Sequence, residues 1–232
     1  MQRATLDNLL EPEIAEAEKN DAVSPEMYEQ PREGFFRVLQ NPLVWEVSRI
    51  GLDLTFGLYR KRSRTMQNWS LLDDNPSIVD IGCGIGQYSD VTRGNYLGID
   101  LARDFIDYAS KRRRKNPNAT FVCDDAARLV DDGSRFDIVL MVDVLHHLSE
   151  VAGAGLLELA GDLSEKYIVS FEPVKDQTNP FGQWFIDHDR GRYIYAYEEL
   201  IEMFENSPLT VVESIPLKLG FINSRAILAK PK

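Results

Sequence analysis

Residues 77–89, S-I-V-D-I-G-C-G-I-G-Q-Y-S, constrain the fold more than any other part of the chain. They begin with an apolar, β-branched run at 78–81, which predicts a short buried strand. Three glycines then follow at alternate positions, Gly82, Gly84 and Gly86. Glycine lets the backbone turn sharply and leaves no Cβ to block a ligand.

We expect a helix to begin within Gln87–Val91, directly after the glycine turn. The unpaired backbone N–H groups of its first turn would face the same ligand as the glycines. A strand, a glycine turn and a helix in this order suit a nucleoside cofactor. Glycine-rich turns also serve as plain tight turns, so the glycines alone leave both interpretations open.

Two acidic residues make the ligand interpretation more specific. Asp80 lies two residues before the first glycine, at the end of the predicted strand. Its carboxylate would repel a pyrophosphate but would suit a ligand that carries an ammonium or sulfonium charge. Asp100 ends a second apolar run, N-Y-L-G-I-D. An acid at that point can accept hydrogen bonds from both ribose hydroxyls.

Four segments carry a resemblance to a known family: D-I-G-C-G-I-G (80–86), G-I-D (98–100), F-V-C-D-D-A-A-R-L (121–129) and F-D-I-V-L-M-V-D-V-L-H-H-L (136–148). Together they resemble the motifs of class I S-adenosylmethionine-dependent methyltransferases. The specific motifs cover residues 77–148, and the rest of the chain fits only in outline. The resemblance implies an α/β, Rossmann-like fold with a seven-stranded, mostly parallel sheet. An antiparallel C-terminal hairpin would close the sheet, helices would cover both faces, and a helical extension would precede it.

The resemblance also implies how S-adenosylmethionine would be held, with S-adenosylhomocysteine as the product. In the family, an acid after the third strand meets the adenine amino group, and the next backbone N–H meets a ring nitrogen. Asp125 and Ala126 match this pattern better than Asp124, which occupies the usual glycine position, so the choice between the two acids stays open. The other expected cofactor residues are Asp80, Gly82, Gly84, Gly86, Asp100, Leu101 and Val142.

A helical pattern at 42–72 precedes the first strand. Its apolar residues recur at three- and four-residue steps and predict one buried stripe, formed by Leu43, Val47, Ile50, Leu54 and Leu58. In the family, an aromatic or basic residue of this upstream helix often meets the methionyl carboxylate. Tyr59 and Arg64 are the candidates here, because arginine has the shape for a carboxylate fork. Arg64 could equally be a surface residue of this helix.

The chain has three histidines, and a base is needed only if the methyl acceptor is protonated at working pH. His147 is the first candidate, because histidine titrates near neutrality. His188, between two aspartates, could be held by a carboxylate. His146 is the third candidate, although either residue of the 146–147 pair could instead pack or cap a helix. No metal site is expected.

Residues 172–195 form a long irregular insertion that mixes aromatic and charged side chains. Insertions of this length are usually functional, and aromatic walls with interleaved polar groups suit a ligand pocket. We therefore expect substrate-binding residues here: Phe181, Trp184, Phe185, Arg190 and Tyr193. The alternative is an aromatic mini-core beneath a surface loop.

The remaining pattern divides the chain into a helical extension or lid at 1–72, with a helix at Thr5–Lys19, and a methyltransferase domain at 73–232. Apolar runs predict further strands at 119–123, 136–142, 167–171, 209–215 and 221–229. Helical patterns fill 101–116, 151–163 and 196–205.

Composition limits the function. A net charge of −11 argues against a nucleic-acid partner, which needs a basic face. No run is long and apolar enough to span a membrane, the N-terminus is too polar for a signal peptide, and two cysteines suggest reduced thiols. Together with the resemblance, this leads us to expect a cytoplasmic enzyme that methylates oxygen or nitrogen of a small-molecule or lipid-like acceptor and that could assemble as a homodimer. The alternatives are an RNA, tRNA or protein methyltransferase, a non-catalytic scaffold of the same fold, and a nicotinamide dehydrogenase.

Overall fold

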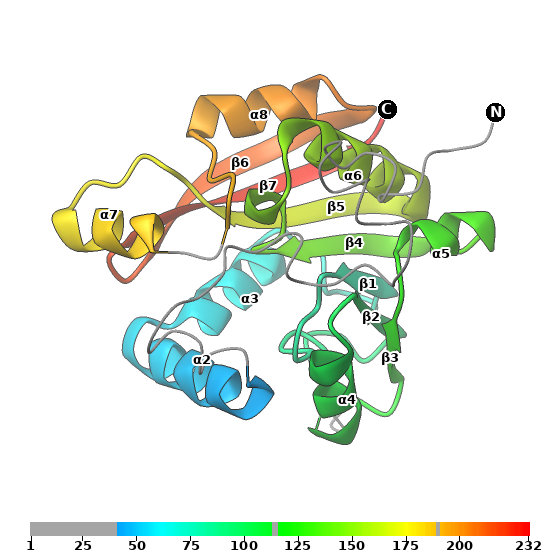
Figure 1. Cartoon of the computed structure of the whole chain (residues 1–232). Coiled ribbons are helices and arrows are strands. Elements are labelled where there is room, and N and C mark those ends of the chain that lie inside the picture. Colours follow the sequence, from blue (N-terminus) through cyan, green and yellow to red (C-terminus); the bar gives the residue numbers. More distant parts are fainter. Residues whose placement is uncertain (1–40, 113–115, 189–190) are drawn as a thin grey trace, which may run out of the picture.

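The computed structural model describes residues 41–112, 116–188 and 191–232 (Figure 1). The predicted helix at 5–19 lies outside the described residues. The strands are β1 (Ile78–Ile81), β2 (Tyr96–Asp100), β3 (Ala119–Cys123), β4 (Phe136–Val142), β5 (Ser164–Pro173), β6 (Leu209–Leu219) and β7 (Ile222–Pro231). The helices are α2 (Pro42–Phe56), α3 (Leu58–Asn68), α4 (Arg103–Arg112), α5 (Ala127–Asp131), α6 (Glu150–Leu163), α7 (Pro180–Asp187) and α8 (Tyr197–Glu205), with a 3₁₀ turn, η5 (Leu145–His147).

The strands form one seven-stranded sheet in the order β3-β2-β1-β4-β5-β7-β6. Strands β1 to β5 pair in parallel, whereas β7 runs antiparallel to both of its neighbours. The predicted fold class is confirmed, including the C-terminal hairpin. The chain proceeds outward from β1 to β3 and then returns to place β4 on the other side of β1. This reversal makes the carboxyl ends of β1 and β4 the topological switch point of the sheet, which is where open α/β sheets bind ligands.

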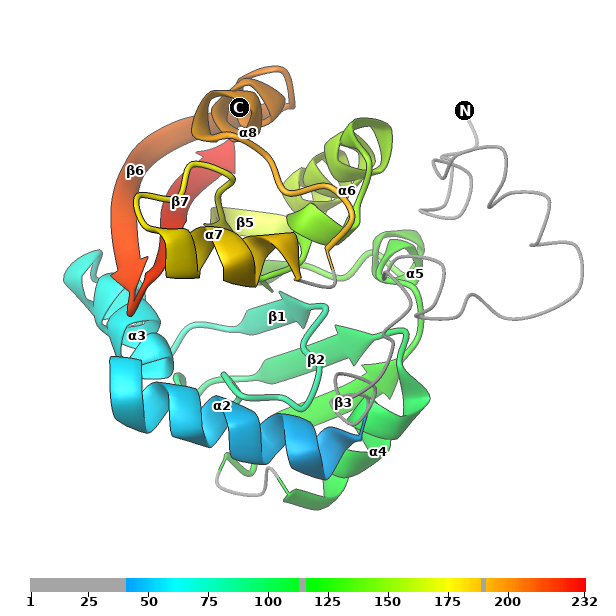
Figure 2. The same ribbon diagram turned by 60° about the vertical axis from the view of Figure 1, so that its left-hand side comes forward.

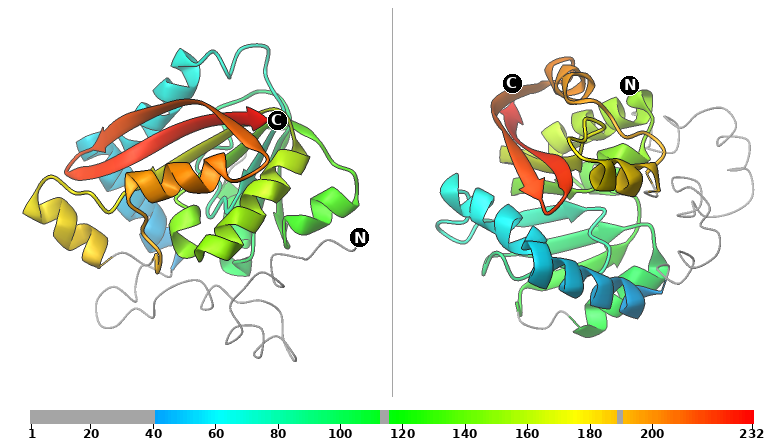
Figure 3. Two further views of the ribbon diagram at one scale, coloured as in Figure 1. Left: turned by 90° about the horizontal axis from the view of Figure 1, so that it is seen from above. Right: turned by 90° about the vertical axis from the view of Figure 1, so that its left-hand side faces the viewer.

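Helices pack on both faces of the sheet, and each face has its own apolar core (Figure 3). On one face, α6 and α8 bury residues such as Leu157 and Phe204 against β4 and β5. On the other face, Met66 of α3 packs with strand residues such as Leu140 and Phe171. The parallel strands are nearly continuous apolar runs because they are covered on both sides.

The predicted helix at Gln87–Val91 is wrong. Residues 84–90 form a series of turns, in which the N–H groups of Gly86, Ser89 and Val91 donate to carbonyls three residues earlier. Tyr88 turns inward and is 4% exposed in the α3-side core. The connection is therefore compact. Helix α3 covers this face of the sheet, where a helix after β1 would otherwise pack.

The predicted buried stripe of α2 is also wrong, except at its last position. Leu43, Val47, Ile50 and Leu54 are 52%, 62%, 51% and 74% exposed, whereas Leu58, at the start of α3, is 6% exposed. The polar side of α2 faces the protein instead, because its charged groups find partners there. Periodicity gave the helix correctly but not the side that is buried.

The tip of the β6–β7 hairpin lies against the end of α2. Gly220 adopts a positive φ of 67°, and a Cβ at this position would lie 2.6 Å from the Phe56 ring. Phe221 packs edge-on against Phe56 with ring centroids 5.3 Å apart, and against Phe181 of α7 at 5.9 Å. The hairpin tip thus joins α2 to α7 at the carboxyl side of the sheet (Figure 2).

Within the described ranges, no helix combines the length and the apolar character required to cross a membrane.

Candidate active site

Asp100, the last residue of β2, organises the glycine turn. Its Oδ2 accepts a hydrogen bond of 2.7 Å from the backbone N–H of Gly84, and its Oδ1 accepts one of 2.8 Å from that of Ala102. The first bond fixes the turn after β1, and the second fixes the approach to α4. Gly82 and Gly84 both have positive φ, which the turn requires and which glycine adopts without strain. The two predicted motifs therefore meet at one end of the sheet.

Asp80 lies beneath this turn and is 1% exposed. Burial raises the pKa of its carboxyl to about 7, although the hydrogen bond that Tyr96 Oη donates works in the opposite direction. The negative charge of Asp100 raises this pKa further. Asp80 therefore exchanges its proton near neutral pH, and a nearby positive charge would favour its ionised form.

The acids after β3 have different partners. Asp124 forms a 3.1 Å ion pair with Arg128, one turn along α5. Asp125 accepts a hydrogen bond of 2.8 Å from the backbone N–H of Ala127 through Oδ1. Its Oδ2 makes no hydrogen bond to the described residues, and Ala126 is buried beside it. This arrangement leaves the Asp125 carboxylate better placed than that of Asp124 to accept from a ligand.

The end of β4 carries an ion-pair cluster that the sequence analysis missed. Asp143 directly follows Val142 and adopts a positive φ of 57°. Its two oxygens accept a fork of hydrogen bonds from Arg62, at 2.9 and 2.6 Å, and Arg49 of α2 adds a third at 2.9 Å. Arg62 shares its buried side of α3 with Leu58, Thr65 and Met66, a three- and four-residue spacing that could have identified it.

The electrostatics of this cluster follow from its burial. Burial alone would raise the pKa of the Asp143 carboxyl, but the Arg62 and Arg49 guanidiniums hold this pKa well below its ordinary value. Asp143 is therefore ionised at any working pH and is a poor proton acceptor. The Nε atoms of both arginines are buried and make no hydrogen bond to the described residues.

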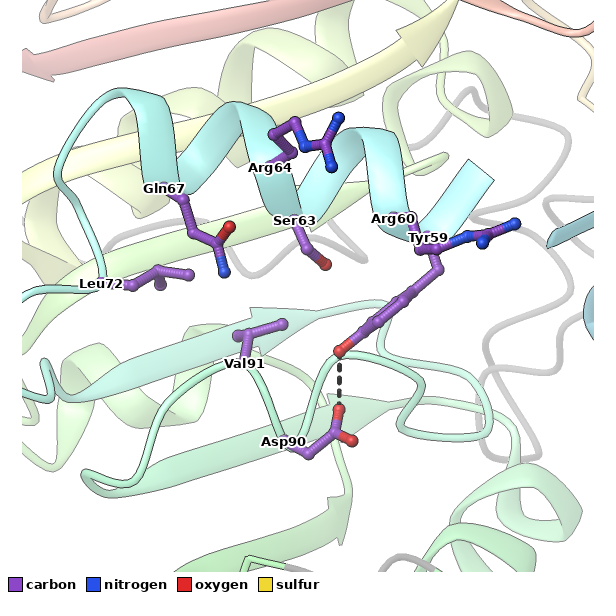
Figure 4. A pocket seen from close by; sticks show the side chains of 8 residues that line it. All are labelled: Tyr59, Arg60, Ser63, Arg64, Gln67, Leu72, Asp90 and Val91. Carbon is purple, nitrogen blue, oxygen red and sulfur yellow. Dashed lines mark hydrogen bonds between the residues drawn. The ribbon is translucent and has the colours of Figure 1, made fainter. Parts of the chain in front are cut away.

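Tyr59 and Arg64, the predicted contacts of the methionyl carboxylate, line a different pocket (Figure 4). It has a volume of about 310 Å³ and lies between α3 and the turn that contains Asp90 and Val91. Tyr59 Oη donates a hydrogen bond of 2.8 Å to Asp90. Burial, together with this acceptor, raises the pKa of Tyr59 above its ordinary value. The Tyr59 ring also packs at a tilt on that of Tyr88, with centroids 5.3 Å apart, so the pocket lies against the turns that follow the glycines.

His146, the third histidine candidate, is buried and 3% exposed. Its Nδ1 lies 2.8 Å from Oε2 of Glu172, a fully buried acid near the end of β5. The other oxygen of Glu172 accepts from the backbone N–H groups of Val144 and Leu145, both at 2.9 Å. Glu172 therefore holds the segment after β4 in place, a role that sequence analysis missed. The sequence signal that could have indicated this role is an acid at the carboxyl end of a buried strand.

The other two histidines lie in different surroundings. His147 is half-buried, and its ring stacks at a tilt on that of His146, with centroids 4.2 Å apart. His188 is exposed at the end of α7, where its Nδ1 lies 2.8 Å from the carbonyl oxygen of Trp184 and its ring stacks on the indole. Within the described residues, no contact brings His188 to the end of β4.

The expected substrate residues gather on and after α7. Phe181 and Trp184 are 71% and 50% exposed, so they do not form a closed mini-core. The Tyr193 backbone N–H donates to the carbonyl of His146 at 2.9 Å, which ties the chain after α7 to the segment after β4. Phe185 has no described side chain and Arg190 lies outside the described residues.

A double-mutant cycle, measured by urea unfolding, tests the pairing of Arg62 with Asp143. We expect Arg62→Met to lower the free energy of unfolding by about 2–4 kcal/mol, because it leaves a largely buried carboxylate with only Arg49. Asp143→Asn should lower the free energy of unfolding by a similar amount. The double variant should lose much less than the sum of the two single losses.

The exposed pair of Arg60 and Asp53, 3.8 Å apart, is the matched control for that cycle. Its coupling should be below about 0.5 kcal/mol, because solvent screens it. Equal coupling in both cycles would contradict the structural role of the Asp143 cluster.

Asp80 should make stability depend on pH. Because its folded-state pKa is near 7, above the ordinary 3.8, the folded protein holds a proton that the unfolded chain has released between these values. The Asp80 contribution to the free energy of unfolding should therefore fall as pH rises from 4 to 7 and stay low above it. Urea titrations of wild type and Asp80→Asn at several pH values in this range measure this contribution, as the difference between the two free energies of unfolding. A pH-independent difference would refute the assignment.

Residues 78–164 match the family model described as a methyltransferase domain. Ubiquinone biosynthesis O-methyltransferase of Coxiella burnetii is 29% identical over 77 residues, which cover 32% of this chain and 33% of that protein. Magnesium-protoporphyrin O-methyltransferase of a Synechocystis species is 30% identical over 116 residues, or 45% of this chain and 49% of that protein. The chain thus spans between a third and a half of these curated relatives.

The fold is also found among solved structures. The crystal structure of magnesium protoporphyrin IX methyltransferase from Synechocystis PCC 6803 with bound S-adenosylmethionine has a TM-score of 0.59 to this chain. The two are 16% identical in sequence, and the match covers 89% of this chain and 88% of that one. Residues 78–164 therefore resemble a methyltransferase domain, and the chain as a whole has the fold of the solved methyltransferase.

Proposed function

We propose that the protein is an S-adenosylmethionine-dependent methyltransferase that acts on oxygen or nitrogen of a small-molecule or lipid-like acceptor. The observation that carries this proposal is Asp100, whose carboxylate binds the glycine turn at the topological switch point of the sheet. The matched family and the methyl acceptors in the relatives' names support it. The net charge of −11 favours a small acceptor over nucleic acid.

The residues present suit such a cofactor. A Cβ at Gly84 would meet nothing closer than 3.9 Å, so the turn leaves room for a ligand. Asp100 would accept from the ribose hydroxyls, and Asp125 with Ala126 would meet the adenine. The buried, unpartnered Nε atoms of Arg49 and Arg62 offer donors for a carboxylate at the end of β4. In this proposal these two arginines take the role that the sequence predicted for Arg64.

S-adenosylmethionine supplies an activated methyl group, so the chain needs mainly to align the acceptor with it and to exclude water. The segment after β4 is rigid because Glu172 holds its backbone N–H groups. Asp143 is committed to two arginines and His146 to Glu172, so neither is suited to remove a proton. His147 is the base that remains at this end of β4, and it would act on acceptors that carry a proton. Its neutral form would accept that proton as the methyl group is transferred.

Both cysteines lie in the described part of the chain and are free thiols, Cys83 being buried. Free thiols are typical of a reducing compartment, which supports the expected cytoplasmic location.

Asp100→Ala tests the cofactor site. We expect it to weaken S-adenosylmethionine binding about 10-fold or more, because two hydrogen bonds worth about 1 kcal/mol each would be lost. Titration calorimetry measures this directly, with S-adenosylhomocysteine as a second ligand and NAD as the negative control. Because Asp100 also orders the turn, Asp100→Asn, which keeps an acceptor oxygen, should weaken binding less than alanine. Equal affinity for wild type and Asp100→Ala would contradict the proposed site.

A metabolite panel assayed by release of S-adenosylhomocysteine tests the activity. Once an acceptor is found, His147→Ala should lower kcat about 100-fold or more if that acceptor is a phenol, alcohol or protonated amine. His188→Ala is the matched control and should leave kcat unchanged, because its ring stacks on Trp184 at the surface. Full activity of His147→Ala on such an acceptor would exclude it as the base. A protein that binds the cofactor but methylates nothing would support the scaffold alternative.

A further inference from the structure

The outer side of α2 is an apolar surface on the described part of the chain. It consists of Leu43, Val44, Val47, Ile50 and Leu54, each between 37% and 74% exposed. Such a continuous stripe is unusual on a soluble protein, where exposed apolar residues are normally scattered. The inner side explains why α2 is oriented in this way. Glu46 bonds to Tyr108 of α4, and Arg49 bonds to Asp143, so the polar residues of α2 are committed to the protein.

A second apolar group lies on α7, formed by Phe181 and Trp184. Figure 1 and the right-hand view of Figure 3 both place α2 and α7 on the same side of the molecule, at the carboxyl ends of β4 and β5. Phe221 at the hairpin tip bridges them, because its ring contacts both Phe56 and Phe181. We call the α2 stripe with Phe181 and Trp184 the apolar rim. It lies beside the end of β4, where the proposed methyl transfer takes place.

Cations collect at one edge of the apolar rim. Arg60 and Lys61 are exposed on the first turns of α3, directly after the end of α2. The Lys61 ammonium donates a hydrogen bond of 2.7 Å to the carbonyl of Lys218, so the exposed Lys218 lies beside it near the hairpin tip. Three neighbouring cations are notable on a chain with a net charge of −11. Apolar side chains, an exposed tryptophan and flanking cations together suit the interface of an anionic lipid bilayer.

We propose that the apolar rim binds the surface of a lipid bilayer that contains anionic phospholipid. The α2 stripe and Trp184 enter the boundary between headgroups and acyl chains, while Arg60, Lys61 and Lys218 lie among the phosphates. The inference rests on the proposed function in one respect, since it assigns the acceptor to the lipid-dissolved class. An acceptor held in the bilayer would then reach the end of β4 without crossing water.

Vesicle flotation with the full-length protein tests this proposal without cofactor or turnover. Wild type should float with vesicles of phosphatidylcholine and phosphatidylglycerol, less with phosphatidylcholine alone, and less at high salt. The double variant V47D/L54D should bind the mixed vesicles at least about 10-fold more weakly, because two charges would replace exposed apolar side chains that the proposal places in the bilayer. The double variant K61A/K218A should bind the mixed vesicles more weakly than wild type does. Its binding to vesicles of phosphatidylcholine alone should be unchanged.

The control is V151D/V212D, which places two charges at exposed valines of α6 and β6. It should float like wild type, and both aspartate double variants should keep the wild-type melting temperature, because the valine and leucine side chains that they replace are exposed. The proposal would be overturned if wild type did not float with the mixed vesicles, or if V47D/L54D and the control lost vesicle binding equally. So would a wild-type dimer in sedimentation that V47D/L54D dissociates, since the rim would then bind a second copy. Calorimetry of cofactor binding on the same samples reports separately on the proposed function.

Discussion

A buried carboxylate needs compensating charge, and Asp143 determines much of this structure through that requirement. Asp143 follows β4 in a left-handed conformation and is held by Arg62 from α3 and Arg49 from α2. Removing one partner would leave a charge poorly solvated, so the two helices are fixed to the carboxyl end of the sheet. The same pairing turns the polar side of α2 inward. The exposed apolar stripe is therefore a consequence of how this charge is satisfied.

The acids of the candidate site differ in behaviour because their surroundings differ. Among the described residues Asp80 has a phenol as its partner and no cation, so burial dominates and its pKa rises to about 7. Asp143 is held by two guanidiniums, so its pKa falls well below the ordinary value. Glu172 uses both oxygens on backbone N–H groups and a histidine, which makes it a fixed support for the segment after β4. Of Asp80 and Asp143, it is Asp80 whose pKa lies near neutral pH.

Local signals in the sequence predicted the elements that depend on neighbouring residues. The β-branched runs gave β1, β3 and β4 closely, and the glycine spacing with Asp100 gave the meeting of the first two motifs. The predicted helix after the glycines was wrong: this segment forms turns that place Tyr88 in the core. The roles predicted for Tyr59 and Arg64 stay predictions, and the structure adds Arg49 and Arg62 as competing candidates.

The sequence alone therefore determined the individual strands and the acid–glycine–acid pattern, because strand periodicity and turn chemistry act over a few residues, while the family resemblance implied the sheet and its C-terminal hairpin. Only the tertiary structure decided which side of α2 is buried, which arginine reaches the end of β4 and which histidine is tied to an acid. These outcomes depend on ion pairs such as Arg62 with Asp143, whose partners lie 81 positions apart. A periodic pattern shows that a helix has two sides, but the distant partner determines which side faces inward.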